Sequence, residues 1–457
     1  MTITKKTLLL AATLSLGLAT SGAAIAQETT AVTDSIKFQY VFNTLLFLIG
    51  GFLVMWMAAG FAMLEAGMVR SKNVAMQCTK NIALYSVAGL IFWVVGYNLM
   101  YAGDGWLVEN VIGSFSAKEI LTGDAELKAV QDAVAAGKDP TLYAGGSDWF
   151  FQMVFCATTA SIVSGTVAER IKLWPFLLFV VVLCGIIYPI QGSWEWGAGW
   201  LDGMGFSDFA GSTLVHSTGG WAALAGAIII GARVGKYGPN GQVNPMPGSS
   251  MPLATLGTFI LWLGWFGFNG ASQLAMGTIT DAASVANIFV NTNLAAAAGV
   301  IAAISLTQLL YGKIDLTMAL NGALAGLVSI TAEPLTPSPL AAIFIGAVGG
   351  VIVVLAVPLL DKLKIDDVVG AIPVHLFAGI WGTLVVPLTN PEVMLHVQFI
   401  GVAAIGAFVF ITSFVVWTII KIVLGLRPSE EMEVGGMDKG EIGLEAYPEF
   451  GAGSQRI

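Results

Sequence analysis

Long apolar stretches, separated by short polar ones, run along nearly the whole chain. A membrane-spanning helix needs about 20 consecutive and mainly apolar residues, and eleven stretches of about that length follow residue 40. They lie at about 41–64, 81–101, 149–168, 173–194, 208–231, 251–272, 284–308, 317–332, 339–359, 371–389 and 397–424. The pattern predicts an all-α polytopic membrane protein with eleven transmembrane helices.

Composition supports this fold class and excludes some partners. Of the 457 residues, 11% are charged and 56% are hydrophobic, whereas about 25% of the residues in a soluble protein are charged. The net charge of −9 argues against nucleic acid as a partner. The three cysteines, Cys78, Cys156 and Cys184, lie in or beside apolar stretches. We interpret them as packing residues and not as a disulfide framework or a metal site.

The first 26 residues have the three parts of a cleaved signal peptide. Lys5 and Lys6 form a basic start, Leu8–Leu18 a short apolar core, and Ala24–Ala26 a small-residue cleavage site. The alternative is an uncleaved anchor helix, but the apolar core is short for a span. The predicted organisation is a cleaved signal peptide at 1–26, an eleven-helix domain at 27–424 and a polar tail at 425–457.

Successive spans are joined by connections that alternate between basic and non-basic composition, as the positive-inside rule predicts. Each odd-numbered connection contains Lys, Arg or both, and those at 195–207, 273–283, 333–338 and 390–396 contain neither. The sequence therefore predicts an N-terminus outside after signal cleavage and a cytoplasmic C-terminus. We expect loop 102–148 to lie outside, with a surface helix at Ala125–Ala136. The acidic tail has two interpretations, a disordered solvating segment or a regulatory element that lies against the cytoplasmic loops.

His216 and His375 lie within predicted spans, where an ionisable side chain is costly and usually functional. The two histidines share one local frame: a valine directly before, a glycine five positions before and a glycine four positions after. His216 falls in the fifth span and His375 in the tenth. The frame predicts a 5+5 inverted repeat with a site at the interface of its halves, plus one C-terminal helix.

Two buried imidazoles suit a substrate that exchanges hydrogen bonds or a proton. Burial disfavours the charged ring, so at least one of them is expected to be neutral, and rings in contact titrate as a pair. The alternative is that each ring separately caps a buried backbone group. No nucleophile or metal set accompanies the histidines in the sequence, so we do not predict an enzyme, and we predict no cofactor.

Aromatic residues form a second set of candidates. Phe151 and Phe155 share one face of the third span, and Trp194 and Trp196 lie at the end of the fourth. The sixth span is crowded with aromatic rings: Trp262, Trp265, Phe266 and Phe268. Aromatic faces attract cations most strongly where water is scarce, so an outer aromatic ring could select a small cation. Ordinary packing or an interfacial belt is the alternative.

Several motifs together resemble the ammonium transporter family (Amt/Mep/Rh). They are Glu65-Ala-Gly-Met-Val-Arg-Ser-Lys-Asn73, Phe151-Gln-Met-Val-Phe155, Ala168-Glu-Arg-Ile171, Asp208 through His216, Gly264-Trp-Phe-Gly-Phe-Asn269, and Val374-His375 with Gly379-Ile-Trp-Gly382. The resemblance extends from about residue 38 to 448. The chain departs from the family pattern in having Trp194 beside Trp196, Gly370 before the second histidine and Leu376 after it.

The resemblance implies a homotrimer with one narrow pore per subunit, in the inner membrane of a bacterial cell. It implies that His216 and His375 are paired pore histidines and that Phe155 and Phe268 form a stacked gate. Trp196, Phe155 and Ser272 would recruit ammonium, with the buried carboxylate of Asp208 in support. A PII-type signalling protein at the cytoplasmic face is a further expected partner.

The expected function is therefore transport of ammonium, with methylammonium as an analogue. Ammonium would be recruited outside and deprotonated, ammonia would pass the histidines, and the proton would follow through the imidazoles. Two alternatives stay open: a channel for ammonia or another neutral solute without proton movement, and a receptor that uses the pore as a binding site.

Overall fold

The computed structural model describes residues 32–103 and 105–450, so the predicted signal peptide lies outside the described residues. Eight helical runs in this part of the chain are long and apolar enough to cross a membrane. They are α2 (Asp34–Met68), Ser71–Met100, Leu173–Ser193, Ser212–Ile230, α10 (Met251–Ala271), α11 (Ile279–Tyr311), α13 (Pro339–Lys362) and α15 (Leu395–Val423). The described residues contain no β-strand, and the chain is a multi-pass membrane protein.

Three of these runs are composite because their turns widen from α to π geometry. The first is η1 (Ser71–Asn73), α3 (Val74–Ile91), η2 (Phe92–Gly96) and α4 (Tyr97–Met100); the second is α7 (Leu173–Val182), η3 (Leu183–Ile187) and α8 (Tyr188–Ser193); the third is η5 (Ser212–Ser217) and α9 (Thr218–Ile230). Single π turns inside helices are frequent at functional sites. The third run carries one of the two candidate histidines.

The other three predicted spans are also helical. They are α6 (Gly145–Thr166), α12 (Leu316–Ile330), and a run of η6 (Ile372–Phe377), α14 (Ala378–Leu384) and η7 (Val386–Leu388). Every residue of α6 from Phe151 onward is buried. Three of its hydroxyl groups bond to carbonyl oxygens one turn back, as Thr158 does to Val154 at 2.8 Å, which hides them from the apolar surroundings. Ser164 and Thr166 donate instead to Glu65 and Asp367. The predicted all-α fold with eleven spans is confirmed.

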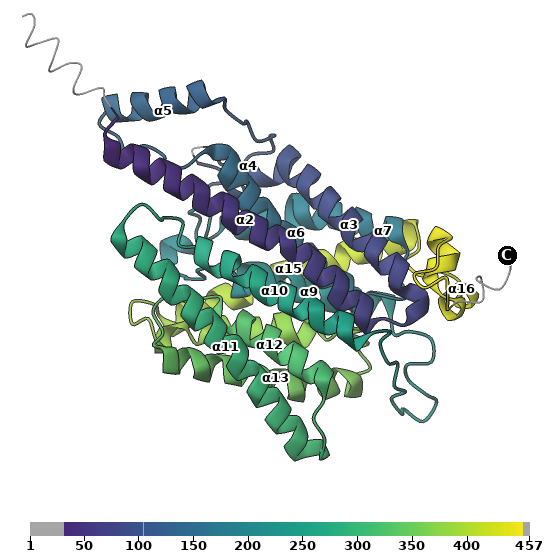
Figure 1. Ribbon diagram of the computed structural model, residues 1–457. Helices are drawn as coiled ribbons and strands as arrows, with labels where there is room; N and C mark the ends of the chain where they lie inside the picture. The colour runs from purple at the N-terminus through teal and green to yellow at the C-terminus, as the bar shows by residue number, and fades with distance from the viewer. Residues whose placement is uncertain (1–31, 104, 451–457) are drawn as a thin grey trace, which may run out of the picture.

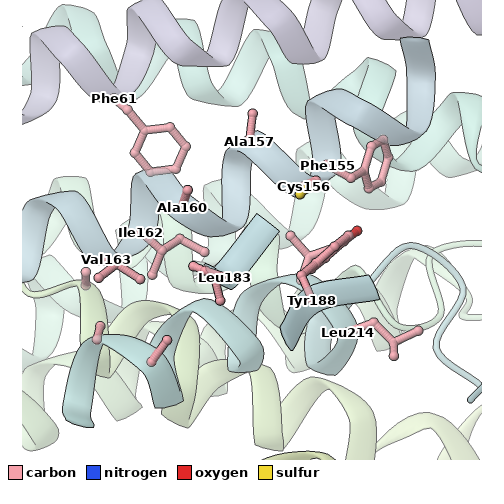
Figure 2. Close-up of a cluster of buried hydrophobic side chains, with 14 of the residues drawn as sticks. Phe61, Phe155, Cys156, Ala157, Ala160, Ile162, Val163, Leu183, Tyr188 and Leu214 are labelled. Atoms are coloured by element: carbon pink, nitrogen blue, oxygen red, sulfur yellow. The ribbon is translucent and has the colours of Figure 1, made fainter. Parts of the chain in front are cut away.

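The first helices of the two halves pack against each other, in agreement with an inverted repeat. α2 opens the first half and α10 the second, and the two lie side by side along their length. Small residues allow this approach: a Cβ on Gly257 would meet the backbone nitrogen of Leu64 at 2.2 Å. The core continues inward from α2 to α6, where Phe61 points between the helices (Figure 2). α15 follows the tenth span and lies against α9 and α7.

The two ends of the bundle carry different structures (Figure 1). At one end lies α5 (Gly123–Ala135), which confirms a helix in loop 102–148 close to its predicted bounds. At the other end residues 425–450 fold against the connections between spans, with α16 (Glu430–Gly435) and η8 (Asp438–Ile442). We call this end the tail side.

The tail is held by its acidic side chains. The Asp438 carboxylate accepts N–H bonds from Ala75 and Met76 at 3.0 and 2.7 Å, and Glu441 accepts one from Leu173 at 3.0 Å. Both carboxylates thus cap the first turn of a spanning helix, where a negative charge is stabilising. The interpretation of the tail as a disordered segment is wrong for residues 425–450.

Candidate functional site

The two histidines, far apart in the chain, meet inside the bundle. The Nδ1 atoms of His216 and His375 are 3.2 Å apart. Their ring centroids are 5.2 Å apart and their planes differ by 21°. The two residues are 0% and 3% exposed. A nitrogen-to-nitrogen contact at this distance is one hydrogen bond, in which one ring donates and the other accepts.

An aspartate caps each histidine helix; Asp208 is buried and Asp367 is half-buried. The Asp208 carboxylate accepts four backbone N–H bonds, from Gly211, Ser212, Thr213 and Leu214, at 2.8–3.1 Å. Asp367, which follows Asp208 at the same interval as His375 follows His216, accepts the N–H of Ile372 at 2.7 Å. Carboxylates at helix starts satisfy N–H groups that have no partner within the helix. These caps set where each π turn begins, and so where each imidazole lies.

Glycines bring the two helices into contact on both sides of the histidine pair. A Cβ on Gly220 would lie 2.6 Å from the Cβ of Leu376, and a Cβ on Gly379 would lie 2.6 Å from the Oγ of Ser217. Leu376 and Ser217 each follow a histidine directly. In each helix, the glycine four positions after the histidine thus contacts the residue that follows the histidine of the other helix, as expected for two repeated halves. Leu376, where the family pattern has glycine, is accommodated by Gly220.

Aromatic rings surround the imidazoles. The His216 ring stacks at 4.9 Å on Trp265 and at 5.2 Å on Phe268, and Phe61 lies 6.2 Å from His375. The Trp265 indole donates to Thr331 at 2.8 Å and is fixed by it. The Nε2 of His216 has no hydrogen-bond partner among the described residues. This nitrogen therefore has an unused capacity for one hydrogen bond.

Two stacked phenylalanines lie next to the histidine pair. The rings of Phe155 and Phe268 are 4.0 Å apart with planes at 25°, and both residues are buried. Phe155 comes from α6 and Phe268 from α10. The predicted phenylalanine pair is thus present as a geometric unit.

Beyond Phe155 opens a vestibule, a cavity of about 410 Å³ on the side of the bundle that carries α5. Its lining is largely aromatic: Phe47, Tyr97, Tyr101, Gly103, Tyr143, Asp148, Phe151, Gln152, Phe155, Trp196, Phe209, Ser272 and Leu274. Trp196 meets Phe155 edge-on at 6.1 Å. The hydroxyl of Ser272 donates to the Phe268 carbonyl oxygen at 2.8 Å, which leaves its oxygen free to accept a bond from a ligand.

The structure distinguishes the neighbouring tryptophans. Trp196 lines the vestibule and donates its indole N–H to the backbone carbonyl oxygen of Asp208 at 3.0 Å. Trp194 instead donates to Val111 at 3.1 Å and packs on Phe408 at 5.1 Å. The Asp208 side chain does not line the vestibule. It acts on Trp196 through its backbone, while its carboxylate caps the histidine helix.

Sequence analysis missed three acidic residues at the site. Asp367 follows Asp208 at the interval that separates the histidines (367 − 208 = 375 − 216), so that interval could have found it. Asp148 lines the vestibule, where the hydroxyl of Tyr97 donates to it. Glu65 was noted only in the family motif, and the structure places it on the tail side of His375, beside a small cavity. In the described part of the chain, no group of three His, Cys, Asp or Glu residues could hold a metal ion.

Comparisons with known proteins identify the family of the chain. The model of the Ammonium Transporter Family matches residues 45–447. Ammonium transporter Amt2 of Archaeoglobus fulgidus is 41% identical over 434 residues, with 88% of this chain and 87% of the relative covered. A putative ammonium transporter of Synechocystis sp. is 41% identical over 435 residues, with 92% and 95% covered.

Solved structures of similar proteins share the fold. A structure described as "Sensor Amt Protein" has a TM-score of 0.79 at 34% identity, and 88% of this chain and 98% of that chain are covered. The structure of Candida albicans Mep2 has a TM-score of 0.75 at 25% identity, with 87% and 89% covered.

Proposed function

This chain belongs to the ammonium transporter family, and we propose that it carries ammonium across a membrane by way of the vestibule, the phenylalanine pair and the histidine pair. One observation carries the proposal: the two imidazoles touch at 3.2 Å in a buried aromatic setting directly behind the rings of Phe155 and Phe268. Such a setting tolerates a neutral solute and a shared proton, but it disfavours an intact cation.

Recruitment takes place in the vestibule. The faces of Trp196 and Phe155 attract a cation through their π electrons, and the Ser272 oxygen accepts one N–H bond. Tyrosines and the carboxylate of Asp148 line the same cavity and make it favourable to positive charge. Ammonium gathers here at the edge of the dry region.

The cation then divides into ammonia and a proton. Carrying the charge intact through an apolar passage would cost several kcal/mol, and giving up one proton removes most of that cost. The N–H bond that breaks leaves its electron pair on ammonia, and the proton passes to the Nε2 of His216, which has no partner among the described residues. The contact between the two Nδ1 atoms continues the path to His375. Ammonia passes the phenylalanines separately.

Current measurements on proteoliposomes test this mechanism. Solid-supported membrane electrophysiology should show currents with ammonium and methylammonium but not with potassium, which has no proton to give. His216→Ala combined with His375→Ala should abolish the ammonium current. An unchanged current and unchanged exclusion of potassium in the double variant would refute the relay. Uptake without current would indicate a neutral channel, and binding without uptake would indicate a receptor.

The organisation of the mature protein belongs to the same proposal. We propose that residues 1–26 are a cleaved signal peptide, that the N-terminus lies outside, and that 27–424 form the transporter domain of a homotrimer in a bacterial inner membrane. Residues 425–457 form a cytoplasmic regulatory tail, and the loops around it could receive a PII-type protein. The docked tail and the alternation of basic loops support this orientation. N-terminal sequencing and light scattering of the purified protein test the cleavage and the trimer.

A further inference from the structure

A small cavity lies beyond the histidine pair, on the tail side. It is lined by Phe61, Leu64, Glu65, Ser161, Ile162, Gly165, Asn321, Leu324, Val369, Ala371, Val374 and His375. The centre of a water-sized molecule has about 10 Å³ in which to move there, which is about the least that holds one water. Ammonia and ammonium are of that size. The cavity therefore has room for one such molecule next to His375.

The carboxylate of Glu65 has two very different oxygens. Oε2 accepts bonds from the side chains of Gln77, Asn81 (2.7 Å) and Ser164 (2.9 Å). Oε1 has no hydrogen-bond partner among the described residues, although Glu65 is 1% exposed. A buried carboxylate oxygen without a partner is costly. One half of this group is thus anchored and the other half lacks a donor.

The unpartnered oxygen is directed into the cavity. It lies 3.4 Å from the point where a Cβ on Gly165 would stand, and Gly165 lines the same cavity. The Cγ2 methyl of Val369, another lining residue, lies 2.5 Å from the same point and takes the place of a side chain there. Ser161 and Asn321 also contribute to the lining. Asn321 donates its amide N–H to Val369 at 3.1 Å, so its carbonyl oxygen is left as an acceptor.

The residues around the cavity provide hydrogen-bond acceptors, and the positive charge nearest to Glu65 is already bonded to another group. Lys80 lies beside the same cluster, but its Nζ donates to the backbone oxygen of Ser164 at 2.8 Å and lies 5.1 Å from the Phe176 ring centroid. Its charge helps to offset the burial of the carboxylate without occupying Oε1. What the cavity lacks is a donor, and a small cation with several N–H groups would provide it.

We propose that Glu65 is the centre of a second cation site, on the tail side of the histidines, that binds ammonium. Resting on the transport mechanism proposed above, ammonia arriving there takes the proton that His375 releases: an N–H bond on the ring breaks, one forms on ammonia, and the imidazole becomes neutral. The carboxylate stabilises the re-formed cation before it leaves. The passage therefore has one cation site on each side of its dry segment.

Measurements from opposite sides of the membrane test the site. Ammonium currents are recorded in right-side-out and inside-out vesicles. In Glu65→Gln the amide oxygen can keep the three donors of Oε2, while an NH₂ group faces the cavity in place of the anion. We expect the half-saturating ammonium concentration to rise at least about 10-fold from the tail side, a change of about 1.4 kcal/mol, and to stay unchanged from the vestibule side. Trp196→Leu should give the reverse.

A matched control and a binding measurement complete the test. Glu333→Gln removes another buried carboxylate charge, one bonded to Asn390 and Thr336, and should shift neither value. If Glu65→Gln does not fold, Glu65→Asp replaces it in the test. The shorter side chain keeps the negative charge but places the carboxylate further from the cavity. Equilibrium dialysis should show ammonium bound at two sites per chain in purified wild-type protein and at one in Glu65→Gln; ammonium is the probe because the cavity has no room for the methyl group of methylammonium.

The outcomes separate this inference from the transport mechanism. Equal shifts from both sides, or equal binding by wild type and Glu65→Gln, would overturn the second site. Absence of any ammonium current in wild type would overturn the transport mechanism, and the binding measurement would still decide whether Glu65 holds a cation.

Discussion

Asp208 and Asp367 occupy equivalent places in the two halves of this protein. The interval between them equals the interval between the histidines (367 − 208 = 375 − 216), and each carboxylate accepts backbone N–H bonds at the start of a histidine helix. Thr213, bonded to Asp208, and Ile372, bonded to Asp367, are separated by that interval again (372 − 213). The histidine contact thus depends on two caps that hold the helices in register.

The caps differ in the number of bonds, and this gives a first prediction. Asp208→Asn replaces one of two acceptor oxygens with a donor that faces backbone N–H groups. It should lower the free energy of unfolding by about 3 kcal/mol, since bonds to a charged acceptor contribute about 1.5–3 kcal/mol each, and it should strongly reduce transport. Asp315→Asn is the control, because Asp315 caps α12 through Oδ1 alone. Equal losses in both variants, measured by denaturation in micelles, would argue against this role of Asp208.

The second prediction concerns the tryptophans at the vestibule. Trp196→Leu should raise the half-saturating ammonium concentration about 10-fold, within the range of a desolvated cation–π contact, because the ring lines the cavity. Trp194→Leu should lower thermal stability through lost packing on Phe408 and leave the ammonium dependence unchanged. Concentration series of the transport current distinguish the two, and a shift in Trp194→Leu alone would reverse the assignment.

The third prediction concerns the stacked phenylalanines. Phe155→Ala combined with Phe268→Ala removes both rings of a 4.0 Å stack and lets a hydrated cation reach the histidines. Potassium current should appear, with selectivity for ammonium falling about tenfold for each ~1.4 kcal/mol of barrier removed. Phe259→Ala, at a ring of α10 that is 62% exposed, is the control. Full potassium exclusion in the double variant would mean that the rings do not form the barrier.

The fourth prediction concerns a buried ion pair on the tail side, between Arg233 and Asp366. The guanidinium donates to both carboxylate oxygens at 2.8 Å, and the residues are 5% and 1% exposed. Burial by itself raises the pKa of Asp366, but the hydrogen bonds and charge of Arg233, with the charge of Arg170, outweigh it and hold the pKa below its usual value. Asp366→Asn should lower the free energy of unfolding at pH 7 by at most about 3–5 kcal/mol, because it removes both short bonds of the buried Arg233 and leaves it only the longer contact with Glu169 at 3.4 Å.

The stability difference between wild type and Asp366→Asn depends on pH, because the pKa of Asp366 is lower in the folded protein than in the unfolded chain. A carboxyl whose folded-state pKa is depressed stabilises the protein above its unfolded pKa of about 3.9. This stabilisation is lost as the pH falls through the lower, folded value. The melting temperatures of wild type and Asp366→Asn should therefore converge below about pH 4. A gap that persists undiminished in acid would show that the cost has another origin.

The fifth prediction concerns the docked tail. Asp438→Ala removes the acceptor of two N–H bonds at the start of α3, and such caps contribute about 0.5–2 kcal/mol. The tail should open more often, and trypsin should cleave after Lys439 about fivefold faster, consistent with about 1 kcal/mol. Glu430→Ala, at an exposed position of α16, should leave the cleavage rate unchanged. Equal rates in wild type and Asp438→Ala would mean that other contacts hold the tail.

The membrane spans could be predicted from the sequence because each one depends on the apolar residues of a single continuous stretch. Apolar runs must cover about 30 Å of hydrocarbon, so the presence of each span follows from composition, and even the short span at 317–332 is a helix. The bounds do not follow in the same way, because α2 and α11 extend past the predicted spans at both ends. The shared frame of His216 and His375 predicted the repeat for a related reason. An ionisable group within the membrane is so costly that its occurrence in two matching frames indicates a common structural role.

What the sequence determined by itself is thus the set of spans, the repeat and the residues that had to face inward. The tertiary structure alone decided that Trp196 and not Trp194 lines the vestibule, that the imidazoles meet through Nδ1, and that one oxygen of Glu65 is anchored while the other faces a cavity. These are relations between side chains far apart in the chain. They depend on how closely the helices pack, and no pattern along one stretch of sequence encodes such distances.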